Sequence, residues 1–391
     1  MDDIETDVLI IGAGIAGSAL ACGLRNSGLR VVLIDKTDQP LDTARGDHLQ
    51  PRTCEILQRW GVLQNFFDAG AEKREGAIWL TPDGEQIFKS TVSELDIPHP
   101  YFAFINHETI ATTFLDAALE SGNTRVIRPI RNWWLEEDDG SQYTIKVGLP
   151  ESQSVNIRAT LVVGADGRVS RTRSTFAISA AVEKYERGMA VFFSPAANLP
   201  EGNFLNVYLG DSITSVIPRT GGGCKLGIPI AASESALWRK LSATDVVQNL
   251  QQTVPALKVE APKFGDIYAP VYLQADDWVK DGVVLIGDAC HAMHPARSQG
   301  MNVSISCIDE LVDLLTSADN FATRLEVEPL LLEYQSRVKE PVGKLLEKNH
   351  RLGLEMDVPK PGTRKAMEER LRAISRDADA SRAYSMDAAG Y

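Results

Sequence analysis

The chain has 391 residues, of which 44% are hydrophobic and 24% are charged, a balance typical of a folded enzyme and far from that of a disordered segment. Its 53 acidic residues outnumber its 40 basic ones and give a net charge of −13, which makes nucleic acid and anionic membrane surfaces poor partners. The length favours one large α/β domain that carries a second, smaller domain.

The first 35 residues predict a strand, a turn, a helix and a second strand. Asp7–Ile11 is an apolar run, residues 12–17 form a glycine-rich turn, Ser18–Asn26 has a helical pattern, and Arg30–Asp35 reads as a buried strand. The apolar run from Val8 to Leu24 follows acidic residues and is broken by glycines, so we expect neither a secretory signal nor a membrane span.

The middle of the chain alternates between helical and strand patterns. We expect a helix over Arg52–Trp60, a hairpin over Ala77–Lys89 and a helix over Glu108–Glu120. Strand-like segments then fill residues 125–162, and further strand-like segments fill residues 182–232. The second group predicts an antiparallel sheet that is inserted into the α/β frame.

The last third predicts a buried strand over residues 283–287, a helix over residues 300–315 and helical patterns to about Leu354. The charged, alanine-rich stretch from Pro359 is compatible with a terminal helix or with a loose tail. The predicted fold class is α/β, a Rossmann-like domain with an inserted, mainly antiparallel sheet and C-terminal helices. We expect the Rossmann-like frame over residues 1–75, 99–180 and 265–355, the inserted sheet over 76–98 and 181–264, and a terminal segment over 356–391.

The glycine turn is the first motif that carries chemistry. It reads Gly12-Ala13-Gly14-Ile15-Ala16-Gly17, and Asp35-Lys36 ends the next strand, with Asp35 placed 23 residues after Gly12. Such glycines let a pyrophosphate approach backbone N–H groups at a helix N-terminus, and the acid accepts the ribose hydroxyls. The motif predicts dinucleotide binding; a turn used only for packing is the alternative.

Two further motifs follow strands later in the chain. Residues 161–173 read LVVGADGRVSRTR and contain Asp166-Gly167. Residues 283–302 read VVLIGDACHAMHPARSQGMN and contain Gly287-Asp288, Pro295 and Gln299-Gly300-Met301-Asn302. With the glycine turn, these motifs occur in the order and roughly the spacing of one family. The chain therefore resembles the single-component, class A FAD-dependent aromatic hydroxylases, and the resemblance covers most of residues 5–315.

The resemblance implies roles for particular residues at an FAD site. Asp288 would accept hydrogen bonds from the ribityl chain, and the helix that begins near Gly300 would direct its N-terminal amides at the flavin pyrimidine edge. Arg45 stands in the place of a family arginine near the pyrophosphate, although a solvated loop charge is the alternative. His107 stands where the family usually has Arg or Gln, and a histidine that only begins a helix is the alternative. The cofactor residues implied in this way are Gly12, Gly14, Ile15, Ala16, Gly17, Asp35, Lys36, Arg45, His107, Asp166, Gly167, Gly287, Asp288, Pro295, Gln299, Gly300, Met301 and Asn302.

The resemblance also implies a reaction. NADPH or NADH would reduce FAD, O2 would add to form a C4a-hydroperoxide, and an aromatic or polycyclic small molecule would be hydroxylated. A related flavoprotein reductase or halogenase is the alternative enzyme, although no W-x-W-x-I-P segment of a halogenase occurs. A flavoprotein whose FAD is structural, as in a sensor or a binding module, is the alternative from another class. The sequence contains no G-x-S-x-G motif, and we assign no catalytic side chain.

Candidate substrate contacts come from the inserted sheet and the third motif. Phe204, Asn206 and Tyr208 share one face of a predicted strand. Polar candidates are Arg219, His294 and Arg297. Taken alone, each of these six residues is more typical of the protein scaffold than of a substrate contact. Arg297 would face the substrate, the flavin or the solvent.

The cysteines and histidines predict no metal site and no thiol chemistry. The five cysteines include no C-x-x-C pair and no zinc spacing, which favours reduced thiols in a cytoplasmic protein. The adjacent Cys290 and His291 are interpreted as structural, because neighbouring residues rarely face one another.

Overall fold

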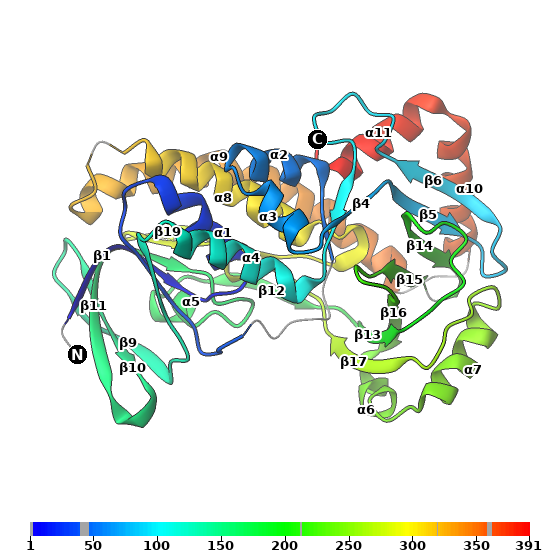
Figure 1. Cartoon of the computed structure of the whole chain (residues 1–391), viewed down its shortest axis with the longest axis horizontal. Helices are drawn as coiled ribbons and strands as arrows, with labels where there is room; N and C mark the ends of the chain where they lie inside the picture. Colours follow the sequence, from blue (N-terminus) through cyan, green and yellow to red (C-terminus); the bar gives the residue numbers. More distant parts are fainter. Residues whose placement is uncertain (1–2, 40–46, 212, 319, 358–361) are drawn as a thin grey trace.

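The computed structural model describes residues 3–39, 47–211, 213–318, 320–357 and 362–391. Figure 1 shows two lobes, each built around a sheet, with α8 and α9 running from one lobe toward the other. The first sheet has the order β19-β20-β11-β1-β2-β8, and β10 and β9 extend it from β11. Its strands are β1 (Ile4–Ile11), β2 (Val31–Ile34), β8 (Thr124–Ile127), β9 (Asn132–Asp138), β10 (Tyr143–Gly148), β11 (Ser154–Gly164), β19 (Val279–Lys280) and β20 (Val283–Leu285).

The centre of this sheet is parallel and fully covered. Residues Val8–Ile11 of β1 pair with β11 on one side and with β2 on the other, and all of them are buried. A strand that is buried on both faces needs a continuous apolar run, which explains why the VLII segment does not alternate with polar residues. The predicted strand, turn, helix and strand at the N-terminus are therefore confirmed.

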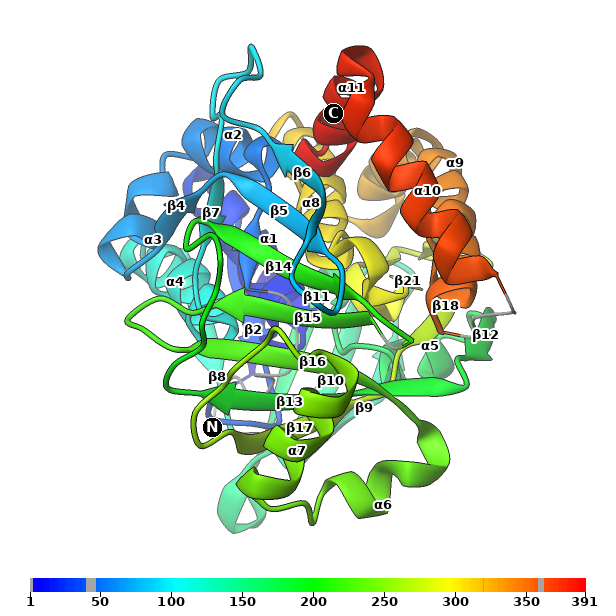
Figure 2. The ribbon, with the colours of Figure 1, turned by 90° about the vertical axis from the view of Figure 1, so that its right-hand side faces the viewer.

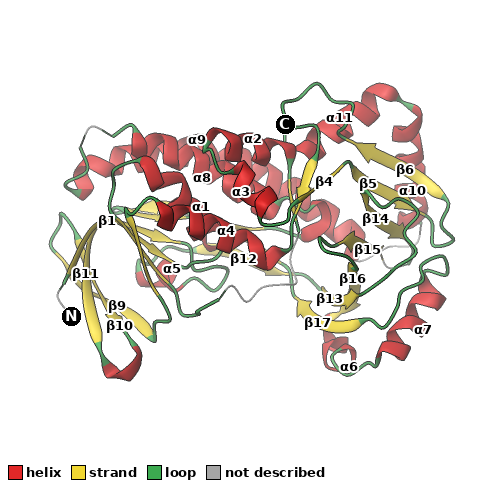
Figure 3. Cartoon of the chain, viewed as in Figure 1, coloured by secondary structure: helices red, strands yellow, loops and turns green. Residues whose placement is uncertain are grey.

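Helices cover this sheet, as Figure 3 shows by secondary structure. Helix α1 packs against α4 and α8, and α8 packs against α9. A Cβ added at Gly23 of α1 would lie 2.5 Å from Val312 of α8, so the two helices approach each other closely at that glycine. The helices of this lobe are α1 (Ile15–Gly23), α2 (Pro51–Arg59), α3 (Leu63–Asp68), α4 (His107–Glu120), α5 (Arg171–Thr175), α8 (Gly300–Thr316) and α9 (Arg324–Asp357).

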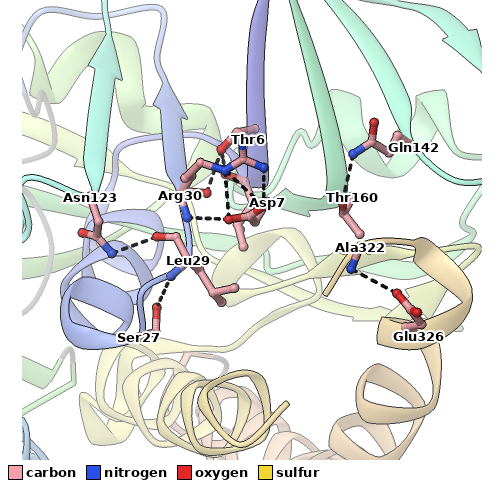
Figure 4. A network of polar contacts seen from close by, with 11 residues as sticks. Thr6, Asp7, Ser27, Leu29, Arg30, Asn123, Gln142, Thr160, Ala322 and Glu326 are labelled. Atoms are coloured by element: carbon pink, nitrogen blue, oxygen red, sulfur yellow. Dashed lines mark hydrogen bonds and ion pairs between the residues drawn. The ribbon is translucent and has the colours of Figure 1, made fainter. Parts of the chain in front are cut away.

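A polar network joins the loop before β2 to the start of β1 (Figure 4). Asp7 accepts hydrogen bonds from the backbone N–H of Arg30 at 2.7 Å and from its Nη2 at 2.6 Å. The hydroxyl of Thr6 donates to the Arg30 carbonyl at 2.7 Å, and Asn123 Nδ2 donates to the Leu29 carbonyl at 2.9 Å. These bonds hold the turn between α1 and β2 at the end of the sheet that is remote from the glycine turn.

The second sheet has the order β17-β13-β16-β15-β14-β5-β6 and is mainly antiparallel (Figure 2). One of its faces packs on α6 and α7 in a separate apolar core, which contains Phe192, Leu226 and Trp238. Its elements are β5 (Gly76–Leu80), β6 (Gln86–Thr91), β13 (Arg187–Ser194), β14 (Phe204–Leu209), β15 (Ile213–Pro218), β16 (Cys224–Ala231), β17 (Lys263–Tyr268), α6 (Ser235–Trp238) and α7 (Ala243–Thr253). The prediction of an inserted antiparallel sheet is confirmed.

The charged C-terminal stretch forms two helices, α10 (Thr363–Arg376) and α11 (Ala378–Ala389), which pack beside β6. Met367 and Leu371 of α10 contact Ile87 and Phe88 of β6 in a small apolar cluster. A loose tail is therefore excluded for these residues, because α10 and α11 lie against the edge strand β6 of the second sheet (Figure 2).

Two small sheets connect the lobes. One has the order β12-β18-β21 and the other the order β3-β7-β4. Their strands are β3 (His48–Leu49), β4 (Glu72–Arg74), β7 (Phe102–Phe104), β12 (Ala180–Lys184), β18 (Val271–Ala275) and β21 (His291–Ala292). None of the helices in the described ranges combines the length and the apolar character that crossing a membrane requires.

Candidate functional site

A cavity of about 400 Å³ lies between the two lobes. Its lining combines loops and helix starts of the first lobe with one face of the second sheet. The predicted cofactor and substrate residues that line it are Gly14, Ile15, Ala16, His107, Gly167, Gly287, Asp288, His294, Pro295, Gly300 and Met301. The structure therefore brings together residues from all three motifs, which are far apart in the sequence.

The three glycines of the first motif have different structural roles. Gly12 has φ +114°, and a Cβ there would lie 2.4 Å from the Ala165 carbonyl oxygen. A Cβ at Gly17 would lie 1.9 Å from the carbonyl oxygen of Gly12, so both positions need glycine for packing. In contrast, a Cβ built at Gly14 meets no atom within 4 Å among the described residues beyond its immediate neighbours in the chain. Gly14 therefore leaves open space at the N-terminus of α1, where a ligand can approach the backbone.

Asp35 stands beside the glycine turn and not in the cavity. Its Oδ2 accepts a hydrogen bond from the Ala13 N–H at 2.6 Å, and its Oδ1 accepts one from the Thr37 N–H at 2.7 Å. The carboxylate thereby orders the turn and keeps lone pairs for further donors. The neighbouring Lys36 is exposed.

The two residues of the second motif have different roles: Asp166 supports the local backbone, and Gly167 lines the cavity. Asp166 accepts hydrogen bonds from the Ser170 hydroxyl at 2.5 Å and from the Thr172 N–H at 2.9 Å, and so organises the start of α5. Arg173 donates to the Ala289 carbonyl at 2.8 Å, and this bond ties the second motif to the third.

The third motif supplies a second helix N-terminus to the cavity. Gly287 and Asp288 line it in a short 3-10 turn, and α8 begins at Gly300, which also lines it. Asn302 does not face the cavity: its Oδ1 accepts hydrogen bonds from the Gln50 N–H at 2.9 Å and the Thr53 hydroxyl at 2.8 Å. Its role in the structure is to join α8 to α2.

The segment between Pro295 and α8 turns toward the C-terminal helices. Ser298 has φ +51°, a left-handed conformation that is uncommon for a residue with a side chain. Arg297 forms an ion pair with Asp387 of α11 and lies over the ring of Tyr384, 4.9 Å from its centroid. Gln299 Nε2 donates to the Asp387 carbonyl at 3.4 Å. Arg297 thus faces neither the main cavity nor the solvent, because α11 covers it.

Sequence reasoning missed a buried ion pair at the cavity wall. Lys225 of β16 lines the cavity, and its Nζ lies 2.6 Å from Oδ1 of Asp47, with both side chains 2% exposed. The same Oδ1 accepts a hydrogen bond from the backbone N–H of His107 at 3.1 Å. Burial raises the pKa of Asp47 and lowers the pKa of Lys225, and the attraction between the two charges opposes both shifts. A lysine inside the apolar CKLGIPI strand was the signal available in the sequence.

His48 is a second residue that sequence reasoning missed. It lines the cavity and stacks on Phe104 with ring centroids 5.1 Å apart, and its Nδ1 has no hydrogen-bond partner among the described residues. Burial lowers the pKa of His48 to about 4, so the ring is neutral at pH 7. It also lines a smaller adjoining cavity of about 100 Å³, which extends toward Arg297 and Tyr384.

The choice of strand face for the substrate contacts was wrong. Phe204 and Tyr208 belong to the apolar core beneath α6 and α7, and Asn206 is fully buried on the same face. The alternate residues Leu205 and Val207 line the cavity. A period-two pattern places residues on a common face, but it does not say which face meets the ligand.

The remaining candidates are held by protein partners. Arg219 pairs with Glu108 at 2.9 Å and lies over Phe193, outside the cavity lining. His291 stacks on Trp278 with centroids 5.2 Å apart, as expected for a structural residue. Arg45 lies outside the described residues.

Within the described ranges, no group of three His, Cys, Asp or Glu side chains is arranged to hold a metal ion.

Comparison with known proteins agrees with this geometry. Residues 5–346 match the family described as FAD binding domain. The chain is 25% identical over 358 residues to the ubiquinone hydroxylase UbiL of Rhodospirillum rubrum, a match that covers 85% of this chain and 78% of that protein. It is 26% identical over 305 residues to a rifampicin monooxygenase of Rhodococcus hoagii, covering 77% of this chain and 61% of that protein.

The fold also matches a solved structure. The p-nitrophenol 4-monooxygenase PnpA of Pseudomonas putida DLL-E4 superimposes with a TM-score of 0.80 and 17% sequence identity. The superposition covers 99% of this chain and 98% of PnpA, so the two proteins share their architecture over nearly their whole length.

Proposed function

The chain belongs to the FAD-binding family of class A flavoprotein monooxygenases, and from this we propose that it hydroxylates an aromatic or polycyclic small molecule with FAD, NADPH or NADH, and O2. The observation that carries the proposal is the composition of the cavity. One wall offers a glycine turn and two helix N-termini, and the opposite wall offers the apolar face of a sheet.

The first wall fits FAD. The open space at Gly14 and the N-terminus of α1 suit the pyrophosphate, and Asp35 lies beside that turn for the adenosine ribose. Asp288 would accept the ribityl hydroxyls, and the amides at Gly300 and Met301 would face the pyrimidine edge. Bound FAD supplies the redox and oxygen chemistry, while the chain binds it, orients it and excludes water.

The opposite wall fits a flat apolar substrate. Its side chains include Trp79, Met189, Val191, Leu205 and Val207, and polar groups are few. Such a surface recognises ring area, and isolated polar groups within it fix orientation. The division of the chain into a cofactor frame and a substrate sheet, with the boundaries expected from the sequence, is part of this proposal.

The proposal includes a small-molecule substrate, no nucleic-acid partner and a cytoplasmic location. The location is supported by the five cysteines, all of which lie in the described ranges, are buried and form no disulfide. Burial raises the pKa of Cys54 and of Cys307 to about 12, so these thiols stay protonated at neutral pH and are poor nucleophiles.

A flavin titration followed by turnover tests the proposal. The purified protein should bind one FAD per chain and should oxidise NADPH or NADH slowly without a substrate. A phenolic or polycyclic substrate should accelerate oxidation of the nicotinamide and oxygen uptake together. Failure to bind FAD at micromolar concentration contradicts the cofactor assignment, and anaerobic reduction of a substrate without oxygen uptake in air supports the reductase alternative.

A further inference from the structure

A second buried pair, formed by His294 and Asp357, lines the cavity. His294 precedes the short η5 turn (Pro295–Arg297), and Asp357 is the last described residue of α9. His294 Nε2 lies 3.2 Å from Asp357 Oδ1, and the two side chains are 4% and 7% exposed. Two polar side chains are thus held together at a site that is otherwise rich in apolar groups.

One hydrogen bond to the His294 ring indicates which ring nitrogen carries the proton. The backbone N–H of Ala296 donates to Nδ1 at 3.1 Å, so Nδ1 is an acceptor and the ring proton is on Nε2. Nε2 is also the ring nitrogen that lies within ion-pair distance of Asp357 Oδ1, at 3.2 Å. Tyr185 packs edge-on against the ring at 4.7 Å, and a Cβ at Gly353 would lie 2.6 Å from it. The imidazole ring is therefore packed tightly on several sides.

The second carboxylate oxygen of Asp357 has no such partner. Oδ2 is buried and lacks a hydrogen-bond partner among the described residues. The charge of Asp357 acts on Arg364 of α10. Burial lowers the pKa of Arg364, and the attraction of Asp357 opposes this shift. However, Arg364 Nη2 donates to the carbonyls of Met356 at 2.6 Å and Asp211 at 3.2 Å. A buried carboxylate oxygen without a donor is costly, so the site calls for a donor from a ligand.

We propose that Asp357, oriented by His294, accepts a hydrogen bond from a hydroxyl or N–H group of the substrate. The enzyme accordingly selects phenols or arylamines over analogues in which that hydrogen is replaced by a methyl group. The inference rests on the proposed function and goes further, because it names the substrate group that this chain recognises. Asp357 determines specificity, and His294 is a positioning residue.

The test is equilibrium binding of 1-naphthol and 2-naphthol and of their methyl ethers, without a reductant present. Binding is followed by perturbation of flavin absorption and by isothermal titration calorimetry. A charge-assisted hydrogen bond is worth about 10-fold or more in affinity, so the wild type should bind a naphthol at least about 10-fold more tightly than its ether. Equal binding of naphthols and ethers to the wild type, or binding of neither, overturns the proposal.

Two pairs of variants separate recognition from folding. Asp357→Asn replaces the acceptor with an amide N–H that an ether oxygen can also use, so the preference should fall below about 3-fold. The matched control is Glu355→Gln on the same helix, which loses an ion pair with Arg370 but does not line the cavity, and it should keep the preference. His294→Gln retains an N–H donor and should keep more of the preference than His294→Ala.

Each outcome bears on a different statement. FAD content reports on the proposed function, and the naphthol-to-ether ratio reports on this inference, since calorimetry measures that ratio with or without flavin. An unchanged naphthol-to-ether ratio in Asp357→Asn overturns the inference. The same holds if the variant has a lower melting temperature, through lost contact with Arg364, but an unchanged ratio. If Asp357→Asn bound FAD more weakly but kept the naphthol-to-ether ratio, the carboxylate would contact the flavin and not the substrate, and the inference would be overturned.

Discussion

Lys225 Nζ lies 2.6 Å from Asp47 Oδ1, and this contact joins β16 of the second sheet to the residue directly before β3. The pair is almost completely buried and borders the cavity. Desolvating two charges is expensive, so such a pair is stable only while both partners remain. It therefore links the second sheet to the segment before α2 and brings a polar group to an apolar wall.

Lys225→Met is expected to lower the free energy of unfolding by about 3–5 kcal/mol, because the carboxylate of Asp47 would remain buried without its cation. The double variant Lys225→Met with Asp47→Asn should recover much of this loss, since no uncompensated charge remains. Urea denaturation at pH 7 measures both values. A loss below about 1 kcal/mol in the single variant would show that the pair is not desolvated as described.

Gly14→Val should abolish tight FAD binding and leave the fold intact. The added side chain enters open space at the start of α1, where it would occupy the approach of the pyrophosphate. Gly17→Ala is the contrasting variant, because its Cβ would meet the Gly12 carbonyl oxygen, and it should lower the stability of the apoprotein by about 1–3 kcal/mol. Thermal melts and flavin fluorescence titrations distinguish them; normal FAD affinity in Gly14→Val would refute the assigned approach.

Asp288→Ala should weaken FAD binding by about 10- to 100-fold, which corresponds to one buried charge-assisted hydrogen bond. Asp288 lines the cavity in the turn before the second helix N-terminus. Asp277→Ala, at an exposed position outside the cavity lining, is the matched control and should bind FAD as the wild type does. If both variants retained the same affinity, the ribityl role of Asp288 would be wrong.

Acid should destabilise the protein through its buried histidines. Burial lowers the pKa of His48 and of His291 to about 4, whereas an unfolded histidine titrates near 6.5. Below pH 6.5 the unfolded chain therefore binds protons that the folded chain does not, and the stability present above that pH is lost progressively toward pH 4. Each of these two histidines should lower the free energy of unfolding by about 2 kcal/mol when the pH falls from 7 to 5.

His291→Leu removes one of these groups and lies outside the cavity lining. The difference in unfolding free energy between pH 7 and pH 5 should shrink by about 2 kcal/mol relative to the wild type. Urea titrations at the two pH values give this difference directly. An identical pH dependence in the two proteins would mean that His291 binds a proton in the folded state at the same pH as in the unfolded chain.

Much of the fold was predictable because its signals are local. The buried strands of the first sheet appear as continuous apolar runs, and the glycine turn, the helix starts and the three motifs appear in fixed chain order. Gly12 and Gly17 are glycines for steric reasons that act within a few residues of the motif or on its neighbouring strand. The family and the cofactor class follow from such local patterns, and the comparisons confirm both.

The substrate side of the cavity depended on the tertiary structure. On β14 both faces carry large apolar side chains, one face beneath α6 and α7 and the other at the cavity, so periodicity alone favoured neither. Arg297 was assigned by the sequence to the flavin, the substrate or the solvent, and the docking of α11 decided otherwise.

The sequence by itself determined the order of the elements, the nucleotide-binding turn and the family. Only the tertiary structure decided which side chains meet across the cavity, as Lys225 meets Asp47 and His294 meets Asp357. The physical reason is that backbone conformation and hydrophobic periodicity are encoded by neighbours in the chain, whereas the partner of a buried polar group is set by the packing of distant elements.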